Sequence, residues 1–178
     1  KLIQLVTQAM NEGHNQYAPM LGDQGLREAI AYKFKELYQS SYDSASEIVV
    51  TAGATQAIFT VISAFIKSND EVILFKPAYD CYEPAIELHG GKVVPIQLKY
   101  PNYQVDWNQV AEAISERTKM IIINTPQNPC GTIFSKEDMQ QLERLTVDTD
   151  IIVLSDEVYE HMAVDGLQHQ SACLLSEL

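Results

Sequence analysis

The fold can be inferred from the residues between Lys119 and Tyr159, which read KMIIINTPQNPCGTIFSKEDMQQLERLTVDTDIIVLSDEVY. Two short apolar runs, residues 120–123 and 151–154, each end in a polar cluster, and a helical pattern separates them. Apolar runs rich in β-branched residues and bounded by turn residues are typical of buried strands. The stretch therefore predicts a strand–loop–helix–strand unit with neighbouring parallel strands. Ligands bind at the carboxyl ends of such strands, so the polar clusters mark the edge where a site is expected.

Three polar side chains are expected to meet at this edge. Asn128 follows the first strand, whereas Asp156 and Tyr159 follow the second. A simpler interpretation exists for each cluster taken alone. Asp156 would only cap the helix after it, and the segment 128–131 would only be a turn. For either cluster alone, both interpretations stay open.

The rest of the chain also alternates between strands and helices. Further strands are predicted at 47–51, 71–75 and 92–98. The alternation predicts an α/β fold with three layers, α/β/α, and a mostly parallel sheet. Pro95 lies within the strand at 92–98 and cannot donate to a ladder, so that strand is expected at an edge of the sheet.

Apolar patterns predict three helices in the first part of the chain, and a further short helix is predicted at 107–114. The first spans residues 1–12, and Asp23 is placed to cap the second. In the second helix, Leu26 belongs to the apolar stripe, and Arg27 is expected on the solvated side. The third helix begins after Gly53 and is apolar nearly all round, so it is expected to be buried on more than one side.

The turn at the start of this third helix is a candidate anion site. Gly53, Ala54 and Thr55 come directly after the predicted strand at 47–51. Free backbone N–H groups and the positive end of the helix dipole favour an anion there without any lysine. The alternative is a tight turn with small residues that serve packing. The chain has neither of the glycine-rich dinucleotide and nucleotide motifs, which leaves a lone phosphate monoester as the better ligand.

Composition excludes several classes of function. Acidic residues outnumber basic ones by 24 to 12, giving a net charge of −12, and no basic patch indicates nucleic-acid binding. No apolar run reaches membrane length and no signal peptide is present, so a cytoplasmic protein is predicted. The cysteines and histidines show neither disulfide nor metal spacing, and the histidines are expected on the surface or in loops. These residues are Cys81, Cys130, Cys173, His14, His89, His161 and His169.

The combination of N-P-x-G at 128–131 and S-D-E-V-Y at 155–159 resembles the class I/II aminotransferases, which are pyridoxal-phosphate-dependent enzymes of fold type I. The motifs G-A-T-Q-A at 53–57 and P-A-Y-D-C-Y at 77–82 are most similar to the branch with methionine-preferring and kynurenine–glutamine aminotransferases. The resemblance extends over essentially the whole chain. It implies an aspartate-aminotransferase-like large domain in a homodimer. Such an enzyme moves an amino group from an L-amino acid of methionine, glutamine, aromatic or kynurenine type to a 2-oxo acid.

The resemblance assigns a phosphate site to one group of residues. Gly53, Ala54 and Thr55 would bind the phosphate of pyridoxal 5'-phosphate. Tyr17 lies in an irregular loop of the segment similar to the family's Y-x-P-x-G-x-x-x-L-R-x-A-I region. In the family, that tyrosine reaches the cofactor phosphate of the partner subunit.

The resemblance assigns the cofactor ring to a second group. Tyr79 would stack on the ring, and Asp156 would lie beside the ring nitrogen. Asn128 and Tyr159 would hydrogen-bond the phenolic oxygen, and Asn128 would also contact the substrate. A protonated ring then acts as the electron sink for loss of the α-proton, while the protein supplies orientation and electrostatics.

The resemblance also implies what this chain lacks. In the family, the Schiff-base lysine lies in an S-x-x-K segment beyond D-E-V-Y, and the arginine for the substrate carboxylate comes later. The chain ends at Leu178, so neither is expected within it. Residues 1–178 are interpreted as an incomplete cofactor-binding large domain that is inactive alone. Its predicted parts are the N-terminal helices and partner-reaching loop, 1–46, and the sheet region, 47–178.

Two other functions are possible for this pattern. A pyridoxal-phosphate-dependent carbon–sulfur lyase on the same fold would share the cofactor-binding residues. An aminotransferase-like effector domain of a transcription regulator would sense the cofactor without turnover, but no basic segment supports a neighbouring DNA-binding domain. Fold analogy does not separate these chemistries.

Overall fold

The computed structural model describes residues 1–175 and forms two compact units, Lys1–Thr51 and Ala52–Leu178. Within the described residues, no helix has both the length and the apolar character needed to cross a membrane.

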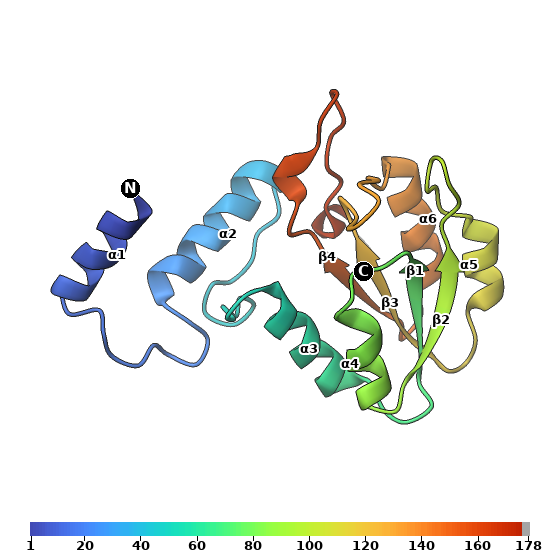
Figure 1. Ribbon diagram of the computed structural model, residues 1–178, viewed down its shortest axis with the longest axis horizontal. Coiled ribbons are helices and arrows are strands. Elements are labelled where there is room, and N and C mark those ends of the chain that lie inside the picture. Colours follow the sequence, from blue (N-terminus) through green and yellow to red (C-terminus); the bar gives the residue numbers. More distant parts are fainter. Residues whose placement is uncertain (176–178) are drawn as a thin grey trace. The chain divides into compact units, whose positions relative to one another are not determined.

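The unit Ala52–Leu178 is built on a four-stranded sheet (Figure 1). The strands are β1 (Glu71–Lys76), β2 (Lys92–Gln97), β3 (Thr118–Asn124) and β4 (Ile152–Asp156). Their order is β2-β1-β3-β4, and all three pairings are parallel. The parallel sheet, the pairing of β3 with β4 and the edge position of the proline-containing strand β2 confirm the sequence-based predictions.

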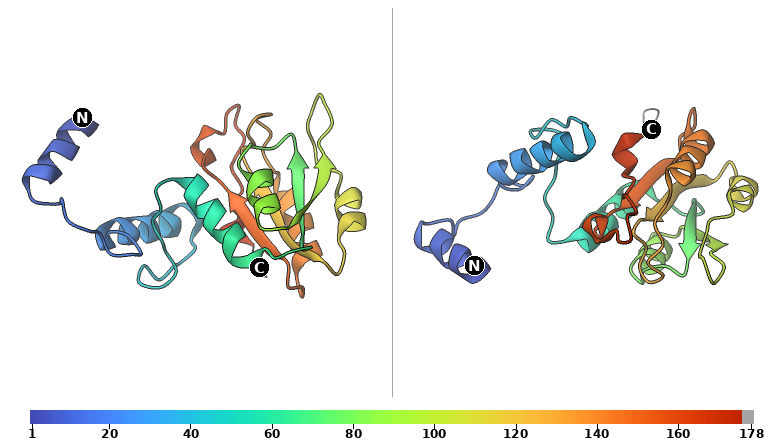
Figure 2. Two further views of the ribbon diagram at one scale, coloured as in Figure 1. Left: turned by 60° about the horizontal axis from the view of Figure 1, so that its bottom comes forward. Right: turned by 90° about the horizontal axis from the view of Figure 1, so that it is seen from above.

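Helices cover both faces of this sheet (Figures 1 and 2). The helices α3 (Ala54–Phe65) and α4 (Tyr82–Leu88) pack on one face, with α5 (Trp107–Ala113) and α6 (Lys136–Thr146) on the other. Successive strand residues point to opposite faces, so Leu74 and Ile122 join the first core, and Ile73 and Ile121 join the second. Burying each such side chain contributes about 1.5–3 kcal/mol. The predicted three layers are confirmed.

Two short 3₁₀ turns follow the last strand. They are η1 (Glu160–Met162) and η2 (Ala172–Leu174).

The first core also contains Ile58 and Ile62 of α3, but Phe59 and Phe65 of the same helix stay exposed. Within this chain, only the sheet-facing stripe of the helix is buried, so its burial on a second side stays a prediction.

The unit Lys1–Thr51 contains α1 (Leu2–Asn11) and α2 (Gln24–Tyr38). Asp23 caps α2 as predicted, because its carboxylate accepts a hydrogen bond of 2.9 Å from the Leu26 N–H. The predicted positions of two residues of α2 are wrong: Leu26 is exposed and Arg27 is buried. The Arg27 guanidinium donates to the backbone carbonyls of Gly22 and Ser44, and these bonds offset the cost of burying it.

The predicted strand at 47–51 is not a strand in the structure. The Val50 N–H donates to the Leu21 carbonyl, which lies in the loop before α2, at 2.9 Å. Apolar β-branched residues favour extended backbone, but a strand also needs a neighbouring strand to pair with. The sequence pattern alone did not specify that neighbour.

Candidate active site

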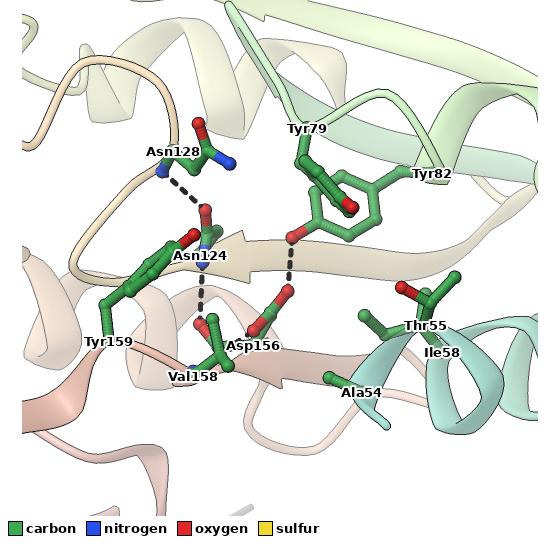
Figure 3. A pocket seen from close by; sticks show the side chains of 10 residues that line it. All are labelled: Ala54, Thr55, Ile58, Tyr79, Tyr82, Asn124, Asn128, Asp156, Val158 and Tyr159. Carbon is green, nitrogen blue, oxygen red and sulfur yellow. Dashed lines mark hydrogen bonds between the residues drawn. The ribbon is translucent and has the colours of Figure 1, made fainter. Parts of the chain in front are cut away.

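A cavity of about 220 Å³ lies where β1, β3 and β4 end and α3 begins. Pockets for drug-sized ligands are typically about 300–1,000 Å³, so this space suits one small ring rather than a dinucleotide. Four of the predicted site residues beyond the α3 turn, Tyr79, Asn128, Asp156 and Tyr159, border it together (Figure 3). Its full lining comprises Ala54, Thr55, Ile58, Tyr79, Tyr82, Asn124, Asn128, Asp156, Val158 and Tyr159.

Asn124 joins the two loops at this edge of the sheet. Its side-chain nitrogen donates to the Asp156 carbonyl at 2.9 Å, and its side-chain oxygen accepts from the Asn128 N–H at 2.7 Å (Figure 3). Asn124 is buried, so both halves of its amide are satisfied within the protein. Asn124 was not predicted as a site residue, although an asparagine directly after the apolar run 120–123 is itself a signal of a required hydrogen bond.

The Asp156 carboxylate is held at both oxygens. Tyr82 donates its hydroxyl to Oδ2 at 2.6 Å, and the Val158 N–H donates to Oδ1 at 3.2 Å. Asp156 is only 8% exposed. The simpler interpretation, in which Asp156 caps the next helix, is wrong: η1 has Tyr159 as its N-cap, without a side-chain cap, and the Asp156 carboxylate accepts from the Val158 N–H within the turn before it. The same carboxylate also borders the cavity.

Tyr82 was also missed by sequence analysis. It starts α4 and is almost completely buried. Burial raises the pKa of its phenol far above the ordinary value, and the hydrogen bond to Asp156 raises it further. The hydroxyl therefore keeps its proton and acts as a donor to the carboxylate.

Tyr79 and Tyr159 supply aromatic walls from different loops (Figure 3). Tyr79 follows β1, and its ring meets the Tyr82 ring edge-on, with centroids 5.9 Å apart and planes at 73°. This contact fixes the Tyr79 ring while leaving it partly exposed beside the cavity. A partly exposed aromatic ring next to a small cavity can pack against a planar ligand.

The amino end of α3 provides backbone donors. Gly53 caps this helix with φ of 93° and ψ of 163°, and as a glycine it makes no side-chain cap. Only glycine adopts this backbone conformation without strain. Ala54 and Thr55, the first two helical residues, line the cavity. The helix end thus presents N–H groups and a positive dipole where an anion can bind.

Tyr17 belongs to the other compact unit, Lys1–Thr51, where its side chain is fully exposed. It is not among the residues that line this cavity. Its role in the site of a partner subunit stays a prediction.

Glu157, the residue after Asp156, holds a later segment of the chain in place through hydrogen bonds. Its carboxylate accepts hydrogen bonds from the Ser155 hydroxyl at 2.6 Å and the Ala172 N–H at 2.8 Å, and the His169 ring lies 2.8 Å from it. His169 lies in the loop between η1 and η2, as predicted for the histidines, and its side chain is only 5% exposed. Glu157 and His169 are 12 positions apart, and the sequence between them has no periodicity that would predict this contact.

Among the described residues, no group of three or more histidine, cysteine or acidic side chains could hold a metal ion. The side chains that line the cavity include amides, a carboxylate and phenols.

The sequence profile of the family described as aminotransferase class I and II matches residues 1–177. The chain belongs to this aminotransferase family. Members depend on pyridoxal phosphate, and both the predicted family and its fold type are confirmed.

Individual relatives of this aminotransferase chain were also found. The chain is 48% identical over 160 residues to a methionine aminotransferase of Escherichia coli, covering 90% of this chain and 42% of the relative. It is 38% identical to human kynurenine–oxoglutarate transaminase 3, covering 87% and 36%. A crystal structure from Escherichia coli, reported to identify a methionine aminotransferase function, superposes with a TM-score of 0.95 at 44% identity, covering 97% and 46%. The chain thus spans less than half the length of these relatives.

The residues present fit the family's cofactor. A buried carboxylate with lone pairs to spare suits a protonated ring nitrogen, and the glycine-capped helix end suits a phosphate. The cavity between them is sized for a single ring.

Proposed function

We propose that this chain forms the cofactor site of a pyridoxal-phosphate-dependent aminotransferase. The enzyme would move an amino group from an L-amino acid of methionine, glutamine, aromatic or kynurenine type to a 2-oxo acid. One observation carries the proposal: the buried Asp156 carboxylate and the first residues of α3, Ala54 and Thr55, border the same small cavity. The names of the relatives support the choice of amino donors.

Each residue then has a role that its position supports. Asp156 holds the proton on the ring nitrogen, and Tyr79 orients the ring by packing against it. Asn128 and Tyr159 donate to the phenolic oxygen, and Asn128 also contacts the substrate. Bound pyridoxal phosphate supplies the electron sink through which the α-carbon of an amino acid can lose its proton.

Two functional groups of the family are proposed to come from outside these 178 residues. None of the residues that line the cavity is a lysine or an arginine. We infer that the lysine bonded to the cofactor and the arginine that binds the substrate carboxylate are contributed by the remainder of a full-length enzyme.

The test is a screen of amino donors with the full-length enzyme. Methionine, glutamine, phenylalanine and kynurenine would each be supplied with several 2-oxo acids, and the amino acid formed from the acceptor would be measured. We expect transfer with at least one of these donors. Release of ammonia and a thiol, without transfer, would instead identify the carbon–sulfur lyase. Cofactor binding without either reaction would favour the sensing domain.

Asn128 and Tyr159 provide a spectroscopic prediction. If both contact the phenolic oxygen, Asn128→Ala and Tyr159→Phe should each shift the pH midpoint at which the absorption band of bound pyridoxal phosphate changes. A hydrogen bond to a charged group is worth about 1.5–3 kcal/mol, which corresponds to a shift of about one to two pH units. An unchanged midpoint in both variants would remove these residues from the ring contacts.

Tyr17 provides a prediction about assembly. We propose a homodimer in which Tyr17 of one subunit donates to the cofactor phosphate of the other, because none of the residues lining the cavity is a lysine or arginine and Tyr17 is fully exposed. Tyr17→Phe should weaken cofactor binding by about 0.5–3 kcal/mol. The measurement is the dissociation constant from an absorbance titration.

Hybrid dimers separate this shared site from a site within one subunit. Tyr17→Phe subunits would be mixed with subunits whose cofactor-bonding lysine has been replaced. A shared site gives hybrids with one intact active site, so activity should rise above that of both parents. Activity equal to the average of the parents would place Tyr17 outside the neighbouring site.

A further inference from the structure

Tyr82 connects two elements that are far apart in the sequence. It begins α4 on one face of the sheet, and its hydroxyl reaches Asp156 at the end of β4 with a bond of 2.6 Å (Figure 3). The side chain is only 1% exposed. A buried phenol needs a partner, and Asp156 is that partner.

The direction of this hydrogen bond is fixed by the surroundings. Burial and the Asp156 carboxylate raise the pKa of the Tyr82 phenol, so the phenol remains the donor. The other titratable groups near this pair are Tyr79 and Cys81. Burial, followed by the charges of Asp156 and Asp80, raises the pKa of the Cys81 thiol, which is therefore neutral at pH 7.

The carboxylate keeps part of its hydrogen-bonding capacity. An ionised carboxylate has about four acceptor positions. Tyr82 occupies one position on Oδ2, and the Val158 N–H occupies one on Oδ1. One donor on each oxygen fixes the rotation of the group, and the remaining positions are available at the cavity that Asp156 borders.

Given the proposed pyridoxal phosphate site, on which this depends, we propose that Tyr82 is a positioning residue. Its hydroxyl fixes the Asp156 carboxylate in the orientation that holds the proton on the ring nitrogen of the cofactor. Tyr82 thus acts on the cofactor through Asp156. Removing its hydroxyl loosens the carboxylate and weakens the one interaction that depends on the ring nitrogen.

A purely structural role gives a different expectation. Tyr82 packs in the core formed by α3, α4 and one face of the sheet. Phenylalanine keeps the ring in that core, so a packing role predicts little change in Tyr82→Phe. Any general loss of stability would also weaken every ligand of the site equally, whatever atoms that ligand carries.

The test compares two ligands in the full-length enzyme. One is pyridoxal phosphate, and the other is its 1-deaza analogue, in which carbon replaces the ring nitrogen. Tyr82→Phe should weaken pyridoxal phosphate by about tenfold to a hundredfold and leave the analogue within about twofold of wild type. Tyr103→Phe is the matched control, because Tyr103 packs in the core on the opposite face of the sheet.

A double-mutant cycle checks that the effect passes through Asp156. In an Asp156→Asn background, adding Tyr82→Phe should change the affinity for pyridoxal phosphate by less than about twofold, since the positioned charge is already gone. Thermal unfolding of the cofactor-free proteins identifies any variant that is misfolded. Should Tyr82→Phe misfold, Tyr82→His, which keeps a ring donor, replaces it and should retain selectivity for pyridoxal phosphate over the analogue.

Two results would overturn the inference. One is unchanged affinity for pyridoxal phosphate in Tyr82→Phe, and the other is an equal loss for both ligands. If the wild-type enzyme bound neither ligand, the proposed function would itself be wrong, and this role of Tyr82 with it.

Discussion

Asp156→Ala should lower amino transfer by the full-length enzyme by a factor of about 10²–10⁴ and weaken binding of pyridoxal phosphate. Asp156 is buried and accepts from Tyr82 and Val158, and the proposed site adds the charged ring nitrogen as a third partner. Removing one member of a buried, hydrogen-bonded charge pair costs about 3–5 kcal/mol, and each 1.36 kcal/mol is a factor of ten. Turnover and cofactor affinity would both be measured.

The control for this variant is Asp150→Ala. Asp150 is exposed and precedes β4, so Asp150→Ala removes a carboxylate without touching the cavity. It should leave turnover within about twofold of wild type. Near-normal turnover in Asp156→Ala would reduce Asp156 to a residue that only stabilises the turn through Val158.

Glu157→Ala should lower the free energy of unfolding by about 2–4 kcal/mol. The change leaves the Ser155 hydroxyl and the Ala172 N–H without their acceptor, and separates His169 from its partner. A buried donor left unsatisfied costs about 1–3 kcal/mol. The measurement is denaturant unfolding at pH 7. The control is Glu112→Ala, because Glu112 is an exposed residue of α5.

The same carboxyl gives a dependence on pH. Burial raises the pKa of Glu157, but the hydrogen bonds from His169, Ser155 and Ala172 outweigh it, so the net pKa is lowered from 4.5. A lowered pKa in the folded state stabilises the fold above the unfolded value, and this stability is lost as pH falls through the folded value. Wild type should therefore lose more stability than Glu157→Gln between pH 6 and an acidic pH below 4.5. Parallel pH profiles for the two proteins would contradict this.

Much of the fold followed from the sequence because local patterns decide it. Buried parallel strands read as apolar β-branched runs, and the polar residues after β3 and β4 had to meet at the same edge of the sheet. Asn128, Asp156 and Tyr159 were placed together on this basis, and the structure brings them to one cavity. The edge position of β2 followed from Pro95 alone.

The features that were missed depend on contacts between distant residues. Tyr82 and Asp156 are 74 positions apart, and nothing in the local pattern around Tyr82 indicates its partner. Arg27 looked like a surface residue because its partners are backbone carbonyls, which carry no sequence signal. The segment 47–51 has a strand-like composition, but composition does not indicate whether a neighbouring strand is present to pair with it.

The place of β4 in the sheet has a thermodynamic consequence. Among the described residues, β4 pairs with β3 on one side only, so the strand that ends in Asp156 forms an edge. A segment that pairs with the open side of β4 and a ligand held by Asp156 would both favour the same ordered strand. Their binding free energies are then coupled, and the coupling is reciprocal: completing the sheet tightens the ligand by the same factor by which the ligand tightens the sheet.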